Sequence, residues 1–343
     1  MKQLLLGREG RPVLEEYTDA PVPEGYVRVS CDFGAPKHGT EWHGTGKDPF
    51  AASYYDEETH IFRKREKELV NEGKSGLGNM FVGKITELGA GVNSLQIGQR
   101  VAGYGNIKNT HTVKASEVLV MPESMSWKEA VCYDPLQFAI GGLRDGHVRV
   151  GDRVLVSGLG AIGLMAAQAA KLAGASFVAV SDPIERRRKA ALENGADIAF
   201  DPVKEDLGLI LRDMTGGMGM DVVIETSGSY QAVEQGIRAA AYGGNFAMVG
   251  WLGECRVPIN LGREGHFNQC HFYFSRACSE PNNDHPRWSF DRICETAWKM
   301  LCDGRFQCEN IVDPVVEFET CDQSYYYYIA EHPSESVKMG VKF

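Results

Sequence analysis

The sequence lacks any apolar run approaching the roughly 20 residues that a membrane-spanning helix needs. Its first residues, MKQLLLGREGRP, hold only three consecutive leucines before charge and glycine return, so we expect no signal peptide there. The sequence also has fewer basic than acidic residues, which gives a net charge of −10. This charge disfavours nonspecific binding to nucleic acid or to an anionic membrane. We therefore expect a cytoplasmic protein with no nucleic-acid or membrane partner.

A cysteine framework is missing as well. The nine cysteines are scattered, their number is odd, and no C-x-x-C pair occurs. This pattern argues against a disulfide-linked domain and against a structural zinc knuckle. We expect most of these cysteines to be buried as small apolar groups.

The 343 residues leave room for two domains, and a hydrophobic content of 43% is that of a globular protein. Residues 1–134 contain short strand-like runs between glycine- and proline-rich turns, which predicts a mainly β domain. Residues 135–274 alternate apolar strand runs with helical segments, which predicts a parallel sheet. From 275 to 343 this alternation stops, and we assign the segment to the C-terminal return of the catalytic domain. Phe290–Cys302 is typical of a helix, and two later apolar runs predict strands that return to the first domain.

One stretch, from Asp152 to Asp182, organises the α/β part. An apolar run over Val154–Val156 predicts a strand buried on both faces. Three glycines follow at the G-x-G-x-x-G spacing, at positions 158, 160 and 163, and then come strong helix formers. A second apolar run ends at Asp182, nineteen positions after the third glycine.

This combination predicts a cradle for the pyrophosphate of a dinucleotide. Gly158 permits a sharp turn, Gly160 lets backbone N–H groups approach the phosphates, and Gly163 lets the helix pack against the sheet. The helix N-terminus at Ala161 and Ile162 offers unpaired donors and a partial positive charge. Asp182 is placed to accept hydrogen bonds from the ribose hydroxyls.

The nicotinamide end is expected beyond two further strands. Ligands of open parallel sheets bind outside the carboxyl ends of the strands. Residues at or beyond the carboxyl ends of the apolar segments 221–225 and 245–250 are therefore assigned to this end: Ser227, Val249, Gly250 and Trp251.

Taken together, these features resemble the medium-chain dehydrogenase/reductase superfamily, and its sorbitol and polyol branch most of all. The matching segments run over nearly the whole chain: Gly98-Gln99-Arg100-Val101, Asp134-Pro135-Leu136, the three glycines, Asn194-Gly195-Ala196-Asp197 and Ser336-Val337-Lys338. The resemblance implies an α/β fold in which a Rossmann doubly wound parallel sheet is inserted in a mainly β (GroES-like) catalytic domain. It also implies hydride transfer between a nicotinamide cofactor and a small-molecule substrate, and we expect a homo-oligomer.

The chain departs from the family at the positions that bind zinc. Histidine stands at position 38, where zinc-dependent members carry a cysteine, and Gly78-Asn79-Met80 replaces the segment G-H-E. Asparagine and methionine are poor zinc ligands, and the usual four-cysteine lobe is absent between Asn106 and Ser116. We therefore expect no metal, although His38, Glu41 and Asp134 leave an altered zinc site as an alternative.

Without zinc, protein side chains must manage the proton that accompanies hydride transfer. Histidine is suited to this near neutral pH, so His43 or His38 is the expected acid/base. Thr40 matches the family's proton-relay hydroxyl, and Glu41 would orient either imidazole. The expected substrate contacts are Asn79 and Asp134, which would hydrogen-bond to hydroxyls, and Trp42 and Tyr104, which would form walls.

The cofactor is expected to be NAD rather than NADP, because a carboxylate at Asp182 repels a 2′-phosphate. Arg186, Arg187 and Arg188 weaken this preference, since arginines nearby could hold that phosphate. By the resemblance, Arg187 occupies a position that packs near the adenine.

Three functional hypotheses remain. The first is a zinc-independent dehydrogenase that acts on a secondary hydroxyl of a sugar, cyclitol or polyol. The second is an NADPH-dependent reductase of activated C=C bonds, resembling quinone and enoyl reductases. The third is a non-catalytic nucleotide-binding protein, as among lens crystallins related to this superfamily. Remnants of the metal motif, from His38 to His43, favour the first.

The stretch 45–75 fits none of these patterns. It contains aromatic residues, among them Tyr54, Tyr55 and Phe62, followed by the charged run Arg63–Glu68. One interpretation is a solvated helix whose charges offset one another. The other is a lid whose aromatics cover the substrate, and arginines facing the cleft would then favour an anionic substrate.

Overall fold

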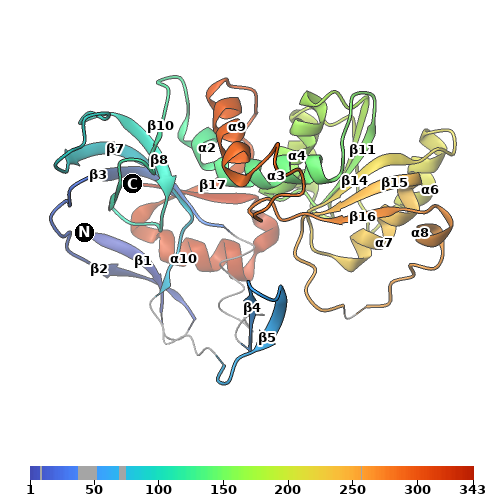
Figure 1. The fold of residues 1–343 in the computed structure, drawn as a ribbon, viewed down its shortest axis with the longest axis horizontal. Coiled ribbons are helices and arrows are strands. Elements are labelled where there is room, and N and C mark those ends of the chain that lie inside the picture. Colours follow the sequence, from blue (N-terminus) through green and yellow to red (C-terminus); the bar gives the residue numbers. More distant parts are fainter. Residues whose placement is uncertain (8–9, 38–51, 69–74, 256) are drawn as a thin grey trace. The chain divides into compact units, whose positions relative to one another are not determined.

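The computed structural model describes residues 1–343 except 8–9, 38–51, 69–74 and 256. The chain forms two compact units (Figure 1). The first unit combines Met1–Val131 with Val312–Phe343, and the second spans Cys132–Ile311. In the part of the chain that the structure describes, no helix has the length and apolar character that crossing a membrane requires.

The first unit is mainly β, as the short apolar runs predict. Its larger sheet has the strand order β10-β8-β7-β3-β18-β17, with β9 also paired to β3. These strands are β3 (Tyr26–Ala35), β7 (Met80–Leu88), β8 (Arg100–Tyr104), β9 (Thr110–Lys114), β10 (Leu119–Val120), β17 (Val312–Glu317) and β18 (Lys338–Lys342). A smaller sheet has the order β2-β1-β6, formed by β1 (Lys2–Leu6), β2 (Pro12–Glu16) and β6 (Ser75–Gly76).

Helical segments complete the core of this unit. They are α2 (Trp127–Val131), η1 (Phe318–Thr320), α10 (Cys321–Tyr325), the π-helical turn η2 (Tyr326–Glu331) and η3 (Pro333–Glu335). One hydrophobic cluster joins Leu4 and Leu6 of β1 to Tyr325 of α10 and Val341 of β18. Tyr325 is fully buried, so the end of α10 packs into this core.

A second cluster of the first unit contains a buried histidine. His111 stacks on Phe81 with ring centroids 4.1 Å apart, and its side chain is 3% exposed. Its Nε2 atom has no hydrogen-bond partner among the described residues. Burial, aided by the charge of Lys108, lowers the pKa of His111 from the usual 6.5 to about 3.

The neutral His111 makes the stability of the protein depend on pH. Its folded-state pKa lies below its unfolded value, so stability is fully present above about pH 6.5 and is lost as pH falls toward 3. We expect His111→Leu to remove this acid-side loss, which amounts to up to about 4 kcal/mol. The check is chemical unfolding of both proteins between pH 3 and 7. Parallel curves for the two proteins would contradict the assignment.

The second unit is built on a six-stranded parallel sheet with the order β13-β12-β11-β14-β15-β16. The strands are β11 (Arg153–Ser157), β12 (Phe177–Ser181), β13 (Ile198–Phe200), β14 (Met220–Glu225), β15 (Ala240–Met248) and β16 (His271–Phe274). The central strands read as near-continuous apolar runs because both of their faces are covered.

Helices cover both faces of this sheet (Figure 1). The helices of the unit are α3 (Tyr133–Asp145), α4 (Ala161–Leu172), α5 (Glu185–Glu193), α6 (Leu207–Met214), α7 (Tyr230–Ala239), α8 (Glu264–Phe267) and α9 (Phe290–Cys302), of which α8 packs on α7 and α9 on α3. On one face, Leu211 of α6 and Ile237 of α7 pack on Phe246 in a fully buried cluster. The doubly wound parallel sheet that the sequence predicts is therefore confirmed.

The second unit extends beyond the expected boundary at residue 274. The segment 275–311 was assigned from the sequence to the returning catalytic part, but its contacts place it in the second unit. The reason is α9, which has the expected bounds but packs on α3, with Trp298 against the ring of Tyr133 at 5.4 Å. The return to the first unit starts at Val312.

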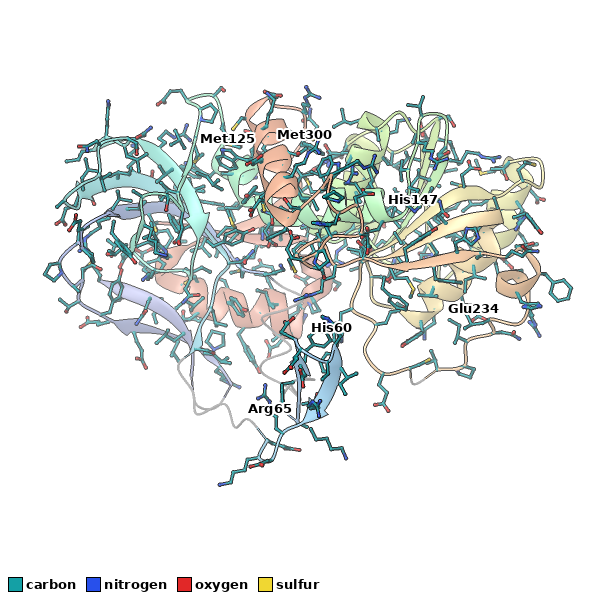
Figure 2. All side chains as sticks on the ribbon, in the orientation of Figure 1. His60, Arg65, Met125, His147, Glu234 and Met300 are labelled. Atoms are coloured by element: carbon teal, nitrogen blue, oxygen red, sulfur yellow. The ribbon has the colours of Figure 1, made fainter. Side chains whose placement is uncertain are left out.

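The stretch 45–75 is not a helix where the structure describes it. Strands β4 (Ser53–Asp56) and β5 (Ile61–Lys64) form an antiparallel hairpin, so the helical interpretation is wrong. The alternation of residues explains this: Tyr55 and Phe62 face each other on one side, with ring centroids 5.4 Å apart. On the other side Arg63 is paired with Asp56, and the aromatic side chains stay exposed. Figure 2 marks this hairpin by His60 and Arg65.

Candidate cofactor-binding site

The strands of the second unit end at a common edge. The register pairs Ser157 with Ser181 and with Glu225, and it pairs Glu225 with Met248. The residues that follow these four are the glycine loop, Asp182, the turn 226–228 and the segment 249–251. The sequence-predicted cofactor residues of the second unit therefore converge at the carboxyl edge of the sheet, where ligands of such sheets bind.

The three glycines serve different physical purposes in the loop. Gly158 has φ +87°, and a Cβ there would lie 2.7 Å from the Cβ of Ser227. A Cβ on Gly163 would lie only 1.8 Å from the carbonyl oxygen of Gly158. A Cβ on Gly160, in contrast, would meet no atom within 4 Å. The first and third glycines are therefore required by packing, whereas Gly160 faces open space.

The N-terminus of α4 is available to an anion. The helix begins at Ala161 with Gly160 as its N-cap, and no side chain caps it. Its first-turn N–H groups carry a partial positive charge and have no intrahelical partners, and Ala161 and Ile162 are only half-buried. The donors and the space at Gly160 fit a pyrophosphate group.

Asp182 supports the glycine loop directly. Its carboxylate accepts hydrogen bonds from the backbone N–H of Leu159 at 2.7 Å and of Ile184 at 2.8 Å. The side chain is 4% exposed, and Arg187 Nη1 lies 3.8 Å from Oδ2. Asp182 thus ties β12 to the loop that follows β11, a role that sequence spacing does not reveal.

Arg187 and Arg188 both contact Asp182, the first at its carboxylate and the second at its backbone carbonyl. Arg187 is largely buried, and desolvation lowers its pKa while the charge of Asp182 opposes that shift. Arg188 donates to the backbone carbonyl of Asp182 at 2.6 Å and lies 3.5 Å from Asp201. Arg186 is exposed at the start of α5. Arg187 and Arg188 therefore both have contacts within the protein.

The predicted nicotinamide end is organised around Glu225, which the sequence analysis treated only as a strand residue. Its carboxylate accepts from the backbone N–H of Ser227 at 2.7 Å, from the Ser227 hydroxyl, and from Gly228 N–H at 3.1 Å. Its backbone carbonyl accepts from Val249 and Gly250 at 2.8 and 2.9 Å. Trp251 follows with a largely exposed side chain. The sequence signal for this role is a charged residue, Glu225, at the end of an otherwise apolar strand.

In the first unit, Asn79 and Tyr104 lie on neighbouring chain segments. Met80 is paired with Tyr104 across β7 and β8, and the backbone of Asn79 accepts from Gly105 at 3.0 Å. The Nδ2 atom of Asn79 is buried and has no hydrogen-bond partner among the described residues. Met80, the next residue, is fully buried.

The remaining predicted residues divide between two cases. Five of them lie outside the described residues: His38, Thr40, Glu41, Trp42 and His43. Asp134 belongs to the second unit, where it is buried in the first turn of α3. Among the residues that the structure describes, no three His, Cys, Asp or Glu side chains group closely enough to hold a metal ion.

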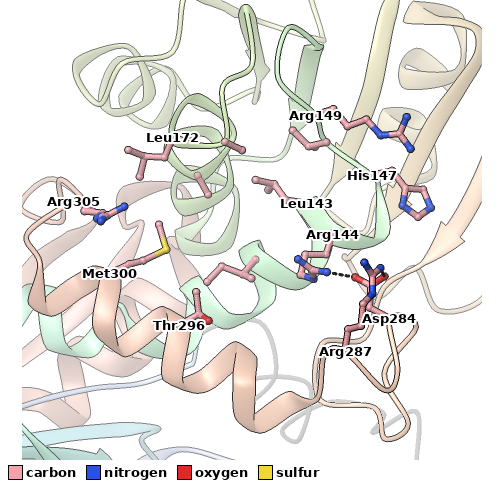
Figure 3. Close-up of a pocket in the computed structure, with 14 residues that line it drawn as sticks. Leu143, Arg144, His147, Arg149, Leu172, Asp284, Arg287, Thr296, Met300 and Arg305 are labelled. Atoms are coloured by element: carbon pink, nitrogen blue, oxygen red, sulfur yellow. Dashed lines mark hydrogen bonds and ion pairs between the residues drawn. The ribbon is translucent and has the colours of Figure 1, made fainter.

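A hollow of about 400 Å³ lies elsewhere in the second unit, where the C-terminal ends of α3, α4 and α9 meet (Figure 3). Its rim carries several arginines, among them Arg144 and Arg305. Arg144 is paired with Asp284, and Arg305 lies 3.5 Å from Asp303. Helix C-termini also carry partial negative charge, so these cations are already balanced and we assign the hollow no ligand.

The chain is similar to known dehydrogenases. A family model described as zinc-binding dehydrogenase matches residues 161–286. The D-guloside 3-dehydrogenase of Escherichia coli K12 is 44% identical over 350 residues, covering 100% of both chains. The sorbitol dehydrogenase of Halalkalibacterium halodurans is 30% identical over 217 residues, covering 54% of this chain and 63% of that one. Galactitol-1-phosphate dehydrogenase from Escherichia coli superposes over 100% of both chains with a TM-score of 0.77 at 19% identity, a likeness of fold.

Proposed function

Because the chain belongs to the medium-chain dehydrogenase/reductase superfamily, we propose that it oxidises a secondary hydroxyl of a sugar, cyclitol or polyol with NAD and without a catalytic zinc ion. The observation that supports this most is the 44% identity, along both whole chains, to a D-guloside 3-dehydrogenase. We narrow the proposed substrate accordingly to a sugar in glycosidic linkage. Such a substrate has several secondary hydroxyls, which could hydrogen-bond to the polar side chains expected at the site, Asn79 and Asp134.

The proposed site holds the cofactor through the second unit. The N-terminus of α4 and the space at Gly160 receive the pyrophosphate, and Asp182 faces the ribose. The segments of Ser227 and Gly250 hold the nicotinamide end. When bound, NAD accepts the hydride from the carbon that carries the hydroxyl. The chain's own residues then have to bind the sugar, orient it and take up the proton.

The proton is assigned to a histidine. As the C–H hydride leaves, the O–H proton passes to His43 or His38, through Thr40 as relay and with Glu41 as orienter. Asn79 supports the substrate role proposed for it, since its buried amide nitrogen still lacks a hydrogen-bond partner within the described part of the chain. Asp134 would bind a second hydroxyl, and Trp42 and Tyr104 would pack on the sugar ring.

Zinc independence is proposed from the side chains at the family's ligand positions. Asn79 offers a neutral amide and Met80 a soft, weakly binding thioether, whereas zinc prefers cysteine, histidine and carboxylate ligands. The family model described as zinc-binding dehydrogenase matches residues 161–286, so its match does not include Asn79 or Met80. No catalytic step is therefore assigned to a metal ion.

One experiment tests the proposed function. The purified protein is incubated with NAD or NADP and a panel of gulosides, other glycosides, free sugars and polyols, with and without a chelator. We expect NADH formation with glycosides, unchanged by the chelator. Turnover that chelation abolishes and zinc restores would overturn the metal-free mechanism. Activity only on enones with NADPH would replace the proposal with the C=C reductase alternative.

The cofactor preference leads to a prediction for Asp182. Asp182→Asn removes the charge that repels a 2′-phosphate, so selectivity for NAD over NADP should fall at least about tenfold. The variant should also lose about 1–3 kcal/mol of stability, because an amide cannot accept from both Leu159 and Ile184. Kd values for NADH and NADPH check the prediction. Glu185→Gln on the exposed start of α5 is the control, and unchanged selectivity in Asp182→Asn would place the ribose elsewhere.

A further inference from the structure

The carboxyl edge of the parallel sheet contains one fully buried charge that the proposed mechanism does not use. Glu225 is the last residue of β14 and is 0% exposed. No lysine, arginine or histidine of the described residues forms an ion pair with it. A buried carboxylate without a cation is costly unless several donors satisfy it, so its surroundings need a physical reason.

The donors that satisfy Glu225 all come from one turn. An ionised carboxylate only accepts hydrogen bonds, and the turn supplies the N–H of Ser227, the hydroxyl of Ser227 and the N–H of Gly228. These bonds favour the charged form, whereas burial favours the neutral form and raises the pKa of Glu225 above its usual range. If the Glu225 carboxylate were protonated, its new O–H group would face other hydrogen-bond donors, and at least one of these hydrogen bonds would be lost.

The same side chain also sets the distance between three loops. A Cβ on Gly250 would lie 2.8 Å from Oε2 of Glu225 and 2.4 Å from the nitrogen of Gly228. The turn in addition packs on the glycine loop, because Thr226 Oγ1 donates to the carbonyl of Gly158 at 2.8 Å. Moving the carboxylate would therefore move the segments 226–228 and 249–251 together.

We propose that Glu225 is a positioning residue for hydride transfer, whose carboxylate holds the segments 226–228 and 249–251 in the arrangement that receives the nicotinamide end of the cofactor. The inference rests on the proposed placement of that end at these segments. It does not depend on the identity of the sugar. Glu225 touches neither substrate nor reacting atoms in this account and acts only through the two loops.

The effect of protonating Glu225 on the two loops can be followed by changing the pH, because few other titratable groups lie near them. Residues 157–160, 226–229 and 248–251 contain no titratable side chain, and the carboxylate that follows β12, Asp182, accepts from Leu159 and Ile184 rather than from the turn 226–228. Helix α3 packs on this side through Gly142, close to Val249, while its Asp145 accepts from Asn283 at 2.9 Å. Protonation of Glu225 is thus the local event expected to loosen the loops as pH falls.

The test is direct binding of NADH, which needs no sugar, measured by fluorescence across acidic to neutral pH. We expect NADH binding to the parent to weaken as pH falls through the raised pKa of Glu225. Glu225→Gln should bind NADH roughly tenfold to a hundredfold more weakly and show no such pH dependence. Glu234→Gln, the same change on α7 (Figure 2), is the matched control and should behave as the parent.

A second variant covers the case in which Glu225→Gln does not fold. Ser227→Ala removes one bond that favours the charged carboxylate, so the acid-side loss of NADH affinity should shift to higher pH. Parent-like affinity in Glu225→Gln, or an acid-side loss that persists in Glu225→Gln or stays in place in Ser227→Ala, would overturn the inference. A failed sugar assay would refute the proposed substrate but leave these binding results valid.

Discussion

Gly163→Ala is expected to destabilise the second unit by about 3 kcal/mol, whereas Gly160→Ala should change its stability by less than about 1 kcal/mol. The new methyl group at position 163 would lie 1.8 Å from the carbonyl oxygen of Gly158, which is backbone and cannot turn aside. At position 160 the methyl group meets nothing within 4 Å, and the φ of −67° suits alanine. Thermal unfolding of the two cofactor-free variants checks this contrast.

The same pair separates packing from cofactor binding. If the pyrophosphate occupies the space at Gly160, Gly160→Ala should weaken NADH binding by roughly tenfold or more, although the protein stays folded. The control is Ala161→Gly, a change of helix propensity at the neighbouring residue. A distant glycine such as Gly195 would not serve, because its φ of +97° would strain an alanine there. Parent-like NADH affinity in Gly160→Ala would show that the phosphates do not approach this loop.

His43→Ala is expected to lower kcat by about two to four orders of magnitude, the usual range for losing an acid/base group. The proposed cofactor site lies in the second unit, so NADH binding should stay unchanged. Stopped-flow turnover with the best glycoside and an NADH titration provide the two measurements. His38→Ala is measured beside it, because either histidine is a candidate for the role.

The control for both histidines is His266→Ala, on the exposed face of the short helix α8. It should leave kcat unaltered. If His43→Ala and His38→Ala both retain the parent kcat, the proton path proposed here is wrong. Loss of NADH binding in either variant would instead point to a folding defect.

The glycine loop could be read from the sequence because its chemistry is local. The turn after β11 needs a positive φ, and the spacing of Gly158 and Gly163 follows from one helical turn packed on that loop. The apolar runs of the parallel sheet are similarly plain, since strands buried on both faces carry few polar residues. These features require no knowledge of distant partners.

Other features depend on contacts between distant segments, which spacing does not encode. Asp182 was assigned to the ribose, but its bond to Leu159 appears only once β11 and β12 lie side by side. Glu225 gained its importance from donors on the following turn and from Gly250, more than twenty residues away. In the hairpin, the sequence left a solvated helix or a lid open, and its exposed aromatic side chains gave no apolar period that would have predicted strands.

The closing strand of the first unit has a consequence for synthesis. β18 lies between β3 and β17, pairing Val341 with Gly34, and its Lys338 donates from a buried position to the carbonyl of Pro36. On a ribosome, residues 132–311 are complete while this strand is still inside the exit tunnel. During synthesis the edge of β3 that pairs with β18 therefore stays open until β18 emerges and fills it.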